Sequence, residues 1–154
     1  MEIRRCKATE VLDQVLRLSK DHWEEVGGMP GCPELKLDLD IILQNELERS
    51  GALVGLGLFD KNQLVGYLQV SVGQSHQHKG VLFAQTDGLF VAKPYRGIRS
   101  FRKVQEMFKQ METILGQEYG VKYFSMRANS NNDLKVLADS LDYTADCIEY
   151  IKRL

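Results

Sequence analysis

The segment between residues 82 and 126 constrains the fold more than any other part of the chain. Residues 82–92 form an apolar run with β-forming residues at its end, which predicts a buried strand that Pro94 ends. Apolar residues then recur at spacings of three and four over residues 101–119, which predicts an amphipathic helix. Residues 121–126 have the pattern of a second strand. Strand, helix and strand joined by short links predict a βαβ unit with parallel strands and a right-handed crossover.

The turn between this strand and this helix is cationic. No acidic residue lies between Lys93 and Lys103, and the basic residues in or beside the turn are Lys93, Arg96, Arg99, Arg102 and Lys103. Cations at a helix N-terminus cost up to about 1 kcal/mol unless an anion offsets them. A glycine-containing turn from a strand into a helix is a common phosphate site, so we expect a phosphate-bearing ligand here. The competing interpretation is a set of solvated side chains on an exposed turn.

Composition limits the class of protein. A chain of 154 residues with 44% hydrophobic and 27% charged residues predicts one domain spanning 1–154. The net charge of −1 argues against a nucleic-acid-coating protein. The widely spaced Cys6, Cys32 and Cys147 predict a reducing cytoplasmic compartment, no disulfide and no metal site. No apolar run reaches the roughly 20 residues that span a bilayer, so we expect no membrane segment and no leader.

The remaining elements follow from caps and periodicity. We expect strands at 2–7, 52–59, 64–72 and 145–153, a helix starting at Thr9, a helix starting at Asp38 or Asp40 and ending at Gly51, and a short helix capped within 129–132. Strands 52–59, 64–72 and 82–92 are expected to be antiparallel neighbours. The predicted order is β-α-α-β-β-β-α-β-α-β.

This order resembles the GNAT N-acetyltransferase superfamily over essentially the whole chain. The segment Asp87-Gly-Leu-Phe-Val-Ala-Lys-Pro-Tyr-Arg-Gly97 is similar to that family's strand followed by a Pro-x-Arg-Gly turn. Leu141-Asp-Tyr143 stands where the family often has Leu-Gly-Phe. Within the superfamily the chain resembles small phage-encoded members. The resemblance implies an α/β (α+β) fold with a mixed sheet of about six to seven strands, a parallel, splayed central pair and about four helices.

The resemblance also implies an activity, the transfer of an acetyl group from acetyl-coenzyme A to an amine. The amide N–H groups of the turn would hold the pyrophosphate. Phe90 and Val91 would offer main-chain groups to the pantetheine and to the thioester oxygen, and Asn131 would face the cofactor from the other side. The implied phosphate site comprises Arg96, Gly97, Ile98, Arg99, Ser100 and Phe101.

The chain departs from the family pattern at three positions. Arg99 and Phe101 occupy positions where the family uses small residues so that the backbone can approach phosphate. We expect Arg99 to compensate with an ion pair and Phe101 to turn into the core. Ala138 stands where many members place the tyrosine that protonates the departing thiolate. These departures leave open a catalytically degenerate GNAT-fold binding module, for example a phage accessory or virion-associated protein contacting a host or structural partner.

Asp87 is the best-placed carboxylate to take a proton from the amine, since strand alternation puts it on the face of Leu89 and Val91. The competing interpretation is a strand-end carboxylate paired with a lysine or an amide. His76 and His78 are interpreted as solvated loop residues rather than a water-linked base or a metal pair. The acceptor, a small-molecule or protein amine, is left open. The exposed last strand predicts an edge through which a homodimer could form.

Overall fold

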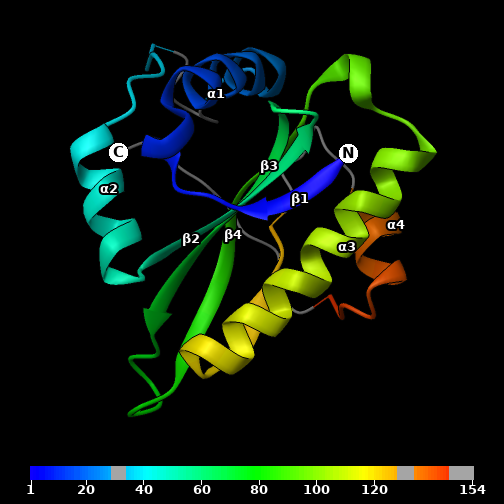
Figure 1. Ribbon diagram of the computed structural model, residues 1–154. Helices are drawn as coiled ribbons and strands as arrows, with labels where there is room; N and C mark the ends of the chain where they lie inside the picture. Colours follow the sequence, from blue (N-terminus) through cyan, green and yellow to red (C-terminus); the bar gives the residue numbers. More distant parts are fainter. Residues whose placement is uncertain (29–33, 128–133, 146–154) are drawn as a thin grey trace.

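The computed structural model describes residues 1–28, 34–127 and 134–145. This part of the chain contains a five-stranded sheet of order β1-β2-β3-β4-β5 with helices around it (Figure 1). The strands are β1 (Glu2–Arg5), β2 (Leu53–Asp60), β3 (Gln63–Gln74), β4 (Leu82–Val91) and β5 (Val121–Ser125). The helices are α1 (Leu12–Val26), α2 (Ile41–Ser50), α3 (Ile98–Ile114) and α4 (Lys135–Ser140).

The sheet has fewer strands than the six to seven predicted. The strand expected at 145–153 falls, apart from Ala145, outside the described residues. The order of the described elements agrees with the prediction, and β1 to β4 pair as antiparallel neighbours. Among the described strands, only β4 and β5, which α3 connects, pair in parallel. The βαβ unit predicted from residues 82–126 is therefore present.

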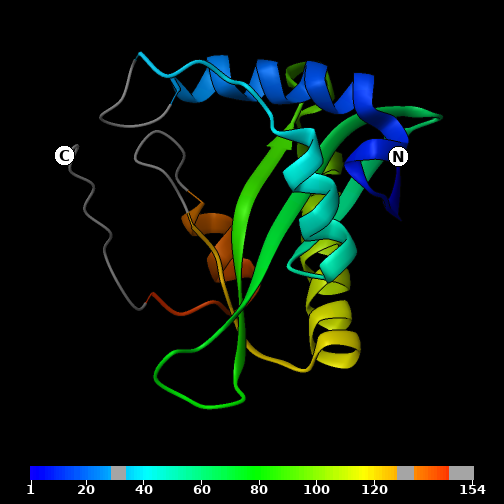
Figure 2. The same ribbon diagram turned by 90° about the vertical axis from the view of Figure 1, so that its left-hand side faces the viewer.

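Two apolar clusters pack on the sheet. The larger one includes Met107, Phe108 and Met111 of α3, all 0% exposed, with residues of β2, β3 and β4. The smaller one joins Leu18 of α1 to Phe59, Leu64 and Phe90. Figure 2 shows α1 running across one end of β3 and β4. The end of β4 is consequently held by α1 and lies close to the start of α3.

Local signals placed both ends of α2 and the glycine that ends the helical segment before β5 correctly. The start of α3 is Ile98 rather than the predicted 101, and the N-cap of α4 is Leu134 rather than a residue within 129–132. The Asp40 side chain accepts the Leu43 N–H at 2.9 Å, and Gly51 and Gly120 end their helices at φ values of 77° and 69°. The predicted start of the first helix was wrong. Thr9 lies in a short 3-10 helix, η1 (Ala8–Val11), and α1 begins at Leu12.

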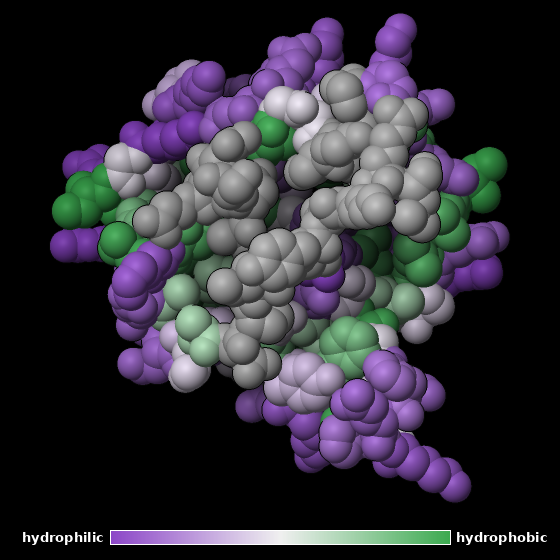
Figure 3. Space-filling model, turned by 180° about the vertical axis from the view of Figure 1, so that it is seen from behind, coloured by the Kyte–Doolittle hydropathy of each residue, from purple (hydrophilic) through white to green (hydrophobic). Residues whose placement is uncertain are grey.

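The surface differs from edge to edge. Seen from behind, hydrophilic side chains gather along the edge over α1, whereas apolar side chains gather at the edge formed by α2 (Figure 3). On α2, Ile42 is 77% exposed and Leu43 is 51% exposed. Within the described ranges, no helix combines the length and the hydropathy that crossing a membrane requires.

Candidate active site

The sheet opens between its two parallel strands. Pairing of β4 with β5 ends at Gln85 and Ser125, although β4 continues to Val91. The last link in the described chain is a hydrogen bond from the Arg127 N–H to the Thr86 hydroxyl at 2.7 Å. Beyond it, no described residue of β5 pairs with β4. Among the described residues, the two parallel strands therefore stop pairing after Gln85, and no described strand pairs with this edge of β4 beyond it.

A cavity of about 320 Å³ lies at this opening. Its lining comes from the end of β4, the start of α3, α4 and the end of α1. The residues include Leu89, Phe90, Val91, Arg96, Gly97, Ser100, Phe101, Leu137, His22 and Glu25. The structure therefore brings most of the predicted cofactor residues around one cavity.

A β-bulge in β4 controls which side chains face the cavity. Gln69 of β3 pairs with Gly88 and Val70 pairs with Thr86, so Asp87 is the extra residue. Leu89 and Val91 pack against the larger apolar cluster, to which Val70 belongs. The Asp87 carboxylate instead accepts a hydrogen bond from Ser71, on the opposite face, at 3.0 Å. The predicted shared face of Asp87, Leu89 and Val91 was wrong because the bulge interrupts the alternation.

The main-chain groups of β4 alternate between β3 and the opening. The Ala92 N–H donates to the Val65 carbonyl at 2.8 Å, so the main chain of Phe90, two residues earlier, is also directed towards β3. The main-chain groups of Leu89 and Val91 are consequently directed to the open edge. In the sequence analysis, Phe90 and Val91 were expected to offer main-chain groups to the cofactor, and Leu89 was not considered. Knowledge of the register, which no local pattern supplies, is needed to choose between adjacent residues.

The turn after β4 exposes a helix N-terminus. Gly97 adopts a φ of 150°, a conformation that favours glycine, and Ile98 begins α3. No described side chain caps this end and its first turn contains no acidic residue. The N–H groups of Ile98, Arg99 and Ser100 therefore have no acceptor inside the helix. This arrangement attracts anions.

The side chains of the turn differ in burial and in the groups that they contact. Ser100 is buried and its hydroxyl donates to the Gly97 carbonyl at 2.8 Å. Ile98 and Arg99 are exposed. Phe101 packs against the larger apolar cluster, as predicted. Of this group, Arg99 carries the charge that can move to meet a phosphate.

The Arg96 guanidinium is paired with other protein groups in this structure. Its Nη1 and Nη2 atoms lie 2.8 Å from the two carboxylate oxygens of Glu25 in α1, and its Nε donates to the Val91 carbonyl at 2.7 Å. The guanidinium also lies 5.3 Å from the centre of the Phe90 ring. Such a two-pronged pair is among the stronger side-chain contacts. Its hydrogen bond is the largest cause of the lowered pKa of Glu25. The arginine expected at the pyrophosphate thus joins α1 to the end of β4.

His22 is a site residue that sequence reasoning missed. Its ring stacks on Phe90 with centroids 4.9 Å apart, and its Nδ1 lies 2.7 Å from the Tyr67 hydroxyl. Burial is the largest cause of the lowered pKa of His22. Burial also raises the pKa of Tyr67 to about 12. Helical periodicity contained a signal, because His22 lies four residues after the buried Leu18 and therefore on the apolar side of α1.

Burial is also the largest influence on Asp87. It raises the pKa of the carboxyl, while the Ser71 hydrogen bond and the Arg127 charge partly offset this effect. The residue nevertheless remains open to solvent. A carboxylate with a raised pKa binds a proton more readily. Asp87 therefore has the chemistry of a base, although the bulge places it before the open edge of β4.

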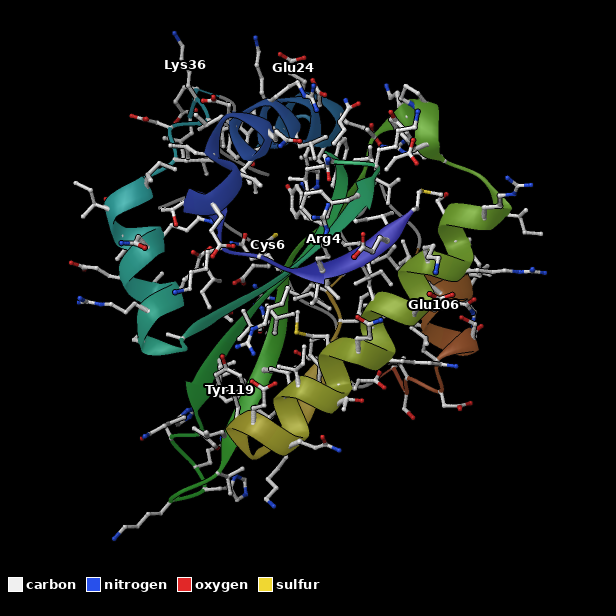
Figure 4. The ribbon with its side chains drawn as sticks, viewed as in Figure 1. Arg4, Cys6, Glu24, Lys36, Glu106 and Tyr119 are labelled. Atoms are coloured by element: carbon white, nitrogen blue, oxygen red, sulfur yellow. The ribbon has the colours of Figure 1, made fainter. Side chains whose placement is uncertain are left out.

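Other predicted groups lie elsewhere. Asn131 is outside the described residues. Ala138 lies on α4, and Tyr143, which follows α4, packs among Phe108 and Phe124 and donates to Glu112 at 2.9 Å. His76 and His78 are exposed in the loop between β3 and β4. Cys6 lies at the end of β1, away from the start of α3 (Figure 4). None of these described side chains lines the 320 Å³ cavity.

Comparisons with known proteins agree with the fold. No family model matches the chain, and no curated protein matches its sequence. Solved structures do match over nearly the whole chain. Ribosomal-protein-alanine N-acetyltransferase from Brucella melitensis biovar Abortus 2308 superposes with a TM-score of 0.68 at 14% identity, covering 100% of both chains. The chain has the GNAT acetyltransferase fold.

Two further structures share this GNAT fold and were solved with ligands. An aminoglycoside acetyltransferase from an uncultured soil metagenomic sample, in complex with sisomicin, matches with a TM-score of 0.70 and 18% identity over 99% of this chain and 95% of that one. AAC(6')-Iy, in complex with the bisubstrate analogue CoA-S-monomethyl-acetylneamine, matches with a TM-score of 0.68 and 18% identity over 99% and 98%. At these identities the likeness shows the GNAT fold alone.

Proposed function

We propose that the protein is an N-acetyltransferase that moves an acetyl group from acetyl-coenzyme A to an amine by direct attack. One observation carries the proposal: the edge of β4 that no described strand pairs with leads directly to the N-terminus of α3, which no described side chain caps. An extended pantetheine chain requires main-chain partners along a strand, and a pyrophosphate requires donors at its end. The two kinds of partner are adjacent here and border the 320 Å³ cavity.

The phosphate end of the cofactor is assigned to α3. The N–H groups of Ile98, Arg99 and Ser100 donate to the pyrophosphate, and the exposed Arg99 side chain adds a charge. Gly97 supplies the backbone conformation that starts the helix. Phe101 supports this end from the core rather than contacting phosphate. Asn131 stays a prediction for the opposite wall.

The acyl end of the cofactor is assigned to β4. Leu89 and Val91 offer main-chain donors and acceptors to the pantetheine and to the thioester oxygen. The Val91 carbonyl accepts from Arg96 in this structure. Cofactor binding along β4 therefore requires Arg96 to move or to share this carbonyl. Asp87 stays a candidate base for the amine.

The acceptor is proposed to be an amine of a small molecule or of a protein. The relatives by fold include an alanine N-acetyltransferase of ribosomal proteins and an aminoglycoside acetyltransferase. Both kinds of acceptor present a primary amine to the thioester. Positioning of that amine against the acetyl carbon supplies much of the rate in reactions of this type.

A binding module without acetyl transfer is the second candidate. The observation that favours it is the pairing of Arg96 with Glu25, together with Arg99 and Phe101 at positions where the family uses small residues. Such a protein would keep the fold and the cavity but present them to a host or virion partner. Cofactor binding distinguishes the two candidates.

Isothermal titration calorimetry with acetyl-coenzyme A tests the proposal. We expect the wild type to bind, and Arg99→Ala to weaken binding about tenfold, which corresponds to about 1.4 kcal/mol. Arg102→Ala is the matched control, because Arg102 is an exposed cation one turn further along α3, and we expect it to leave the affinity unchanged. An absence of binding at millimolar cofactor would favour the binding module. Equal effects of the two variants would remove the phosphate site from the start of α3.

A further inference from the structure

We propose that His22 accepts the proton of the attacking amine and that Tyr67 is the positioning residue that holds its imidazole. The inference rests on the proposed acetyl transfer and adds to it a base that the family resemblance did not supply. It follows from the place of His22 beside the open edge of β4. Tyr67 acts only through His22.

The first argument is the position of the ring. His22 lines the cavity together with Leu89 and Val91, whose main-chain groups are assigned to the acyl end of the cofactor. The imidazole stacks on Phe90, the residue between them, with an interplanar angle of 19°. The stack fixes the ring beside the part of β4 where the thioester is expected.

The second argument is the orientation of the two ring nitrogens. Nδ1 lies 2.7 Å from the Tyr67 hydroxyl, which leaves Nε2 without a hydrogen-bond partner among the described residues. If Nδ1–H donates to the Tyr67 oxygen, Nε2 keeps its lone pair and can accept a proton. Burial raises the pKa of Tyr67 to about 12, with a smaller opposing effect from Ser19, so the Tyr67 hydroxyl stays protonated at neutral pH.

The third argument is the charge around the ring. The groups that face it are Glu25 on α1, Arg96 on the turn after β4 and Tyr67 on β3. Glu25 raises the pKa of His22 and Arg96 lowers it, while burial, the largest influence, lowers it. The imidazole is therefore neutral at neutral pH, which is the state that a base requires.

The proton balance of the step is simple. The amine nitrogen forms a bond to the acetyl carbon, and its proton goes to Nε2. The carbon–sulfur bond breaks with its electron pair on sulfur, giving the thiolate of coenzyme A. The imidazolium then returns the proton to the thiolate or to water. No further reactant is required. Ala138 stands where many family members have the tyrosine that protonates the thiolate, and the His22 imidazolium can donate that proton instead.

Asp87 is the rival base, and the structure separates the two. Asp87 contacts Ser71, whereas His22 contacts Tyr67, four residues earlier on β3 and about 13 Å away at 3.3 Å per residue. The two candidate bases therefore contact β3 at different points along the strand. Replacing each in turn therefore identifies which one receives the proton.

Nitrogen NMR of the imidazole in the full-length protein tests the geometry without relying on activity. We expect His22 to be neutral at pH 7 with the proton on Nδ1, and Tyr67→Phe to abolish that preference. His76→Gln and His78→Gln assign the other two imidazole signals. A proton on Nε2 at neutral pH would overturn the inference, because that nitrogen could not accept another.

Kinetics with acetyl-coenzyme A and sisomicin as the probe amine complete the test. We expect His22→Gln to lower kcat by about 100-fold or more and to remove the acidic limb of its pH profile, with KM for acetyl-coenzyme A little changed. Tyr67→Phe should lower kcat less and shift that limb, while His76→Gln should match the wild type. A wild-type pH profile in His22→Gln, together with its loss in Asp87→Asn, would overturn the role of His22.

The same experiments separate failure of this inference from failure of the proposed function. If the wild type does not bind acetyl-coenzyme A in calorimetry, both fall. If it binds but does not acetylate sisomicin, the position of the His22 proton decides alone. If it binds and His22 is protonated on Nε2, the acetyltransferase stands and His22 is excluded as its base.

Discussion

Arg96 shows how one side chain can change its expected role through a distant partner. All three of its side-chain nitrogens are paired, two with Glu25 and one with the Val91 carbonyl. The partner carboxylate is 71 residues away in the sequence. The pair joins α1 to the end of β4. The resemblance assigned Arg96 to phosphate binding, but in this structure its side chain links two elements. A phosphate that binds Arg96 must break or share these contacts.

Glu25→Gln tests the strength of this contact through pH. The pKa of Glu25 is lowered in the folded protein, so the pair stabilises above the ordinary carboxyl pKa and loses this effect as pH falls through the lowered value. We expect the variant to be less stable than the wild type by up to about 1 kcal/mol at pH 7, and we expect this difference to become smaller as the pH is lowered to 3. Thermal denaturation at both values measures the difference.

Glu24→Gln is the control for that comparison. Glu24 is exposed and interacts only loosely with Lys20, at 3.9 Å, and its side chain points away from the sheet (Figure 4). We expect no measurable change in stability at either pH. A difference between wild type and Glu25→Gln that is as large at pH 3 as at pH 7 would mean that packing, rather than charge, explains the effect.

A second prediction at the residue scale concerns the reactivity of the Cys6 thiol. Burial is the largest cause of its raised pKa, about 11, with smaller contributions from Glu10 and Glu48. In a variant with Cys32→Ser and Cys147→Ser, we expect the remaining thiol to react with a disulfide reagent at pH 7.5 about 300 times more slowly than an ordinary cysteine, because so little thiolate is present. Absorbance of the released thiol measures the rate. Equal rates in buffer and in 8 M urea would contradict it.

At the scale of secondary-structure elements, the bulge in β4 determines which side chains of the strand face each apolar cluster. By inserting Asp87, it directs Leu89 and Val91 towards the larger apolar cluster and leaves Phe90 to meet α1. Gly66 of β3 lies opposite Val91. A Cβ built on Gly66 would lie 2.7 Å from the Phe90 carbonyl oxygen, a main-chain atom that cannot rotate away. Close approach of the two strands at this point therefore requires glycine.

Gly66→Ala is expected to lower the free energy of unfolding by about 1–3 kcal/mol and to weaken acetyl-coenzyme A binding, because β4 must move at its open edge. Gly116→Ala is the matched control. Gly116 lies in the π-helical turn η3 (Leu115–Tyr119), and a Cβ there would meet nothing within 4 Å. We expect this variant to be as stable as the wild type or up to about 1 kcal/mol more stable. Urea denaturation would contradict the argument if both variants behaved alike.

The start of α1 illustrates how tertiary contacts override a local cap at this scale. Thr9 has the right chemistry for an N-cap, yet the chain forms η1 first. The Ala8 N–H donates to Glu48 of α2 at 3.0 Å, and the Lys7 N–H donates to Glu10 at 3.1 Å. These two carboxylates satisfy the N–H groups just before Thr9, and they stabilise the chain in η1 rather than in a helix that begins at Thr9.

For the whole molecule, the central expectation is that a cofactor bound across β4 and α3 stabilises the fold. Acetyl-coenzyme A at 100 times its Kd should add about 2.7 kcal/mol, which for a chain of this size raises Tm by roughly 5–10 °C. Differential scanning fluorimetry measures the shift. NAD is the control, since it carries a pyrophosphate and an adenine but no pantetheine. An equal shift with NAD would show that only the anion site at α3 is used.

The sequence alone was sufficient for features whose cause is local. The apolar periodicity of α3, the Asp40 cap and the glycines that end α2 and the turn before β5 depend on residues a few positions apart, and these predictions were confirmed. The order of the elements and the parallel β4–β5 pair followed from the same patterns. The cationic turn was also visible, because its residues are consecutive.

Tertiary structure alone decided how the site is assembled. The bulge that reverses the face of Asp87 depends on the register with β3, and the partner of Arg96 comes from α1. His22 and Tyr67 are 45 residues apart and meet only because α1 packs across β3 and β4. Contacts of this kind arise from strand register and helix packing, which minimise the energy of the whole chain. A pattern of neighbouring residues does not predict these long-range contacts.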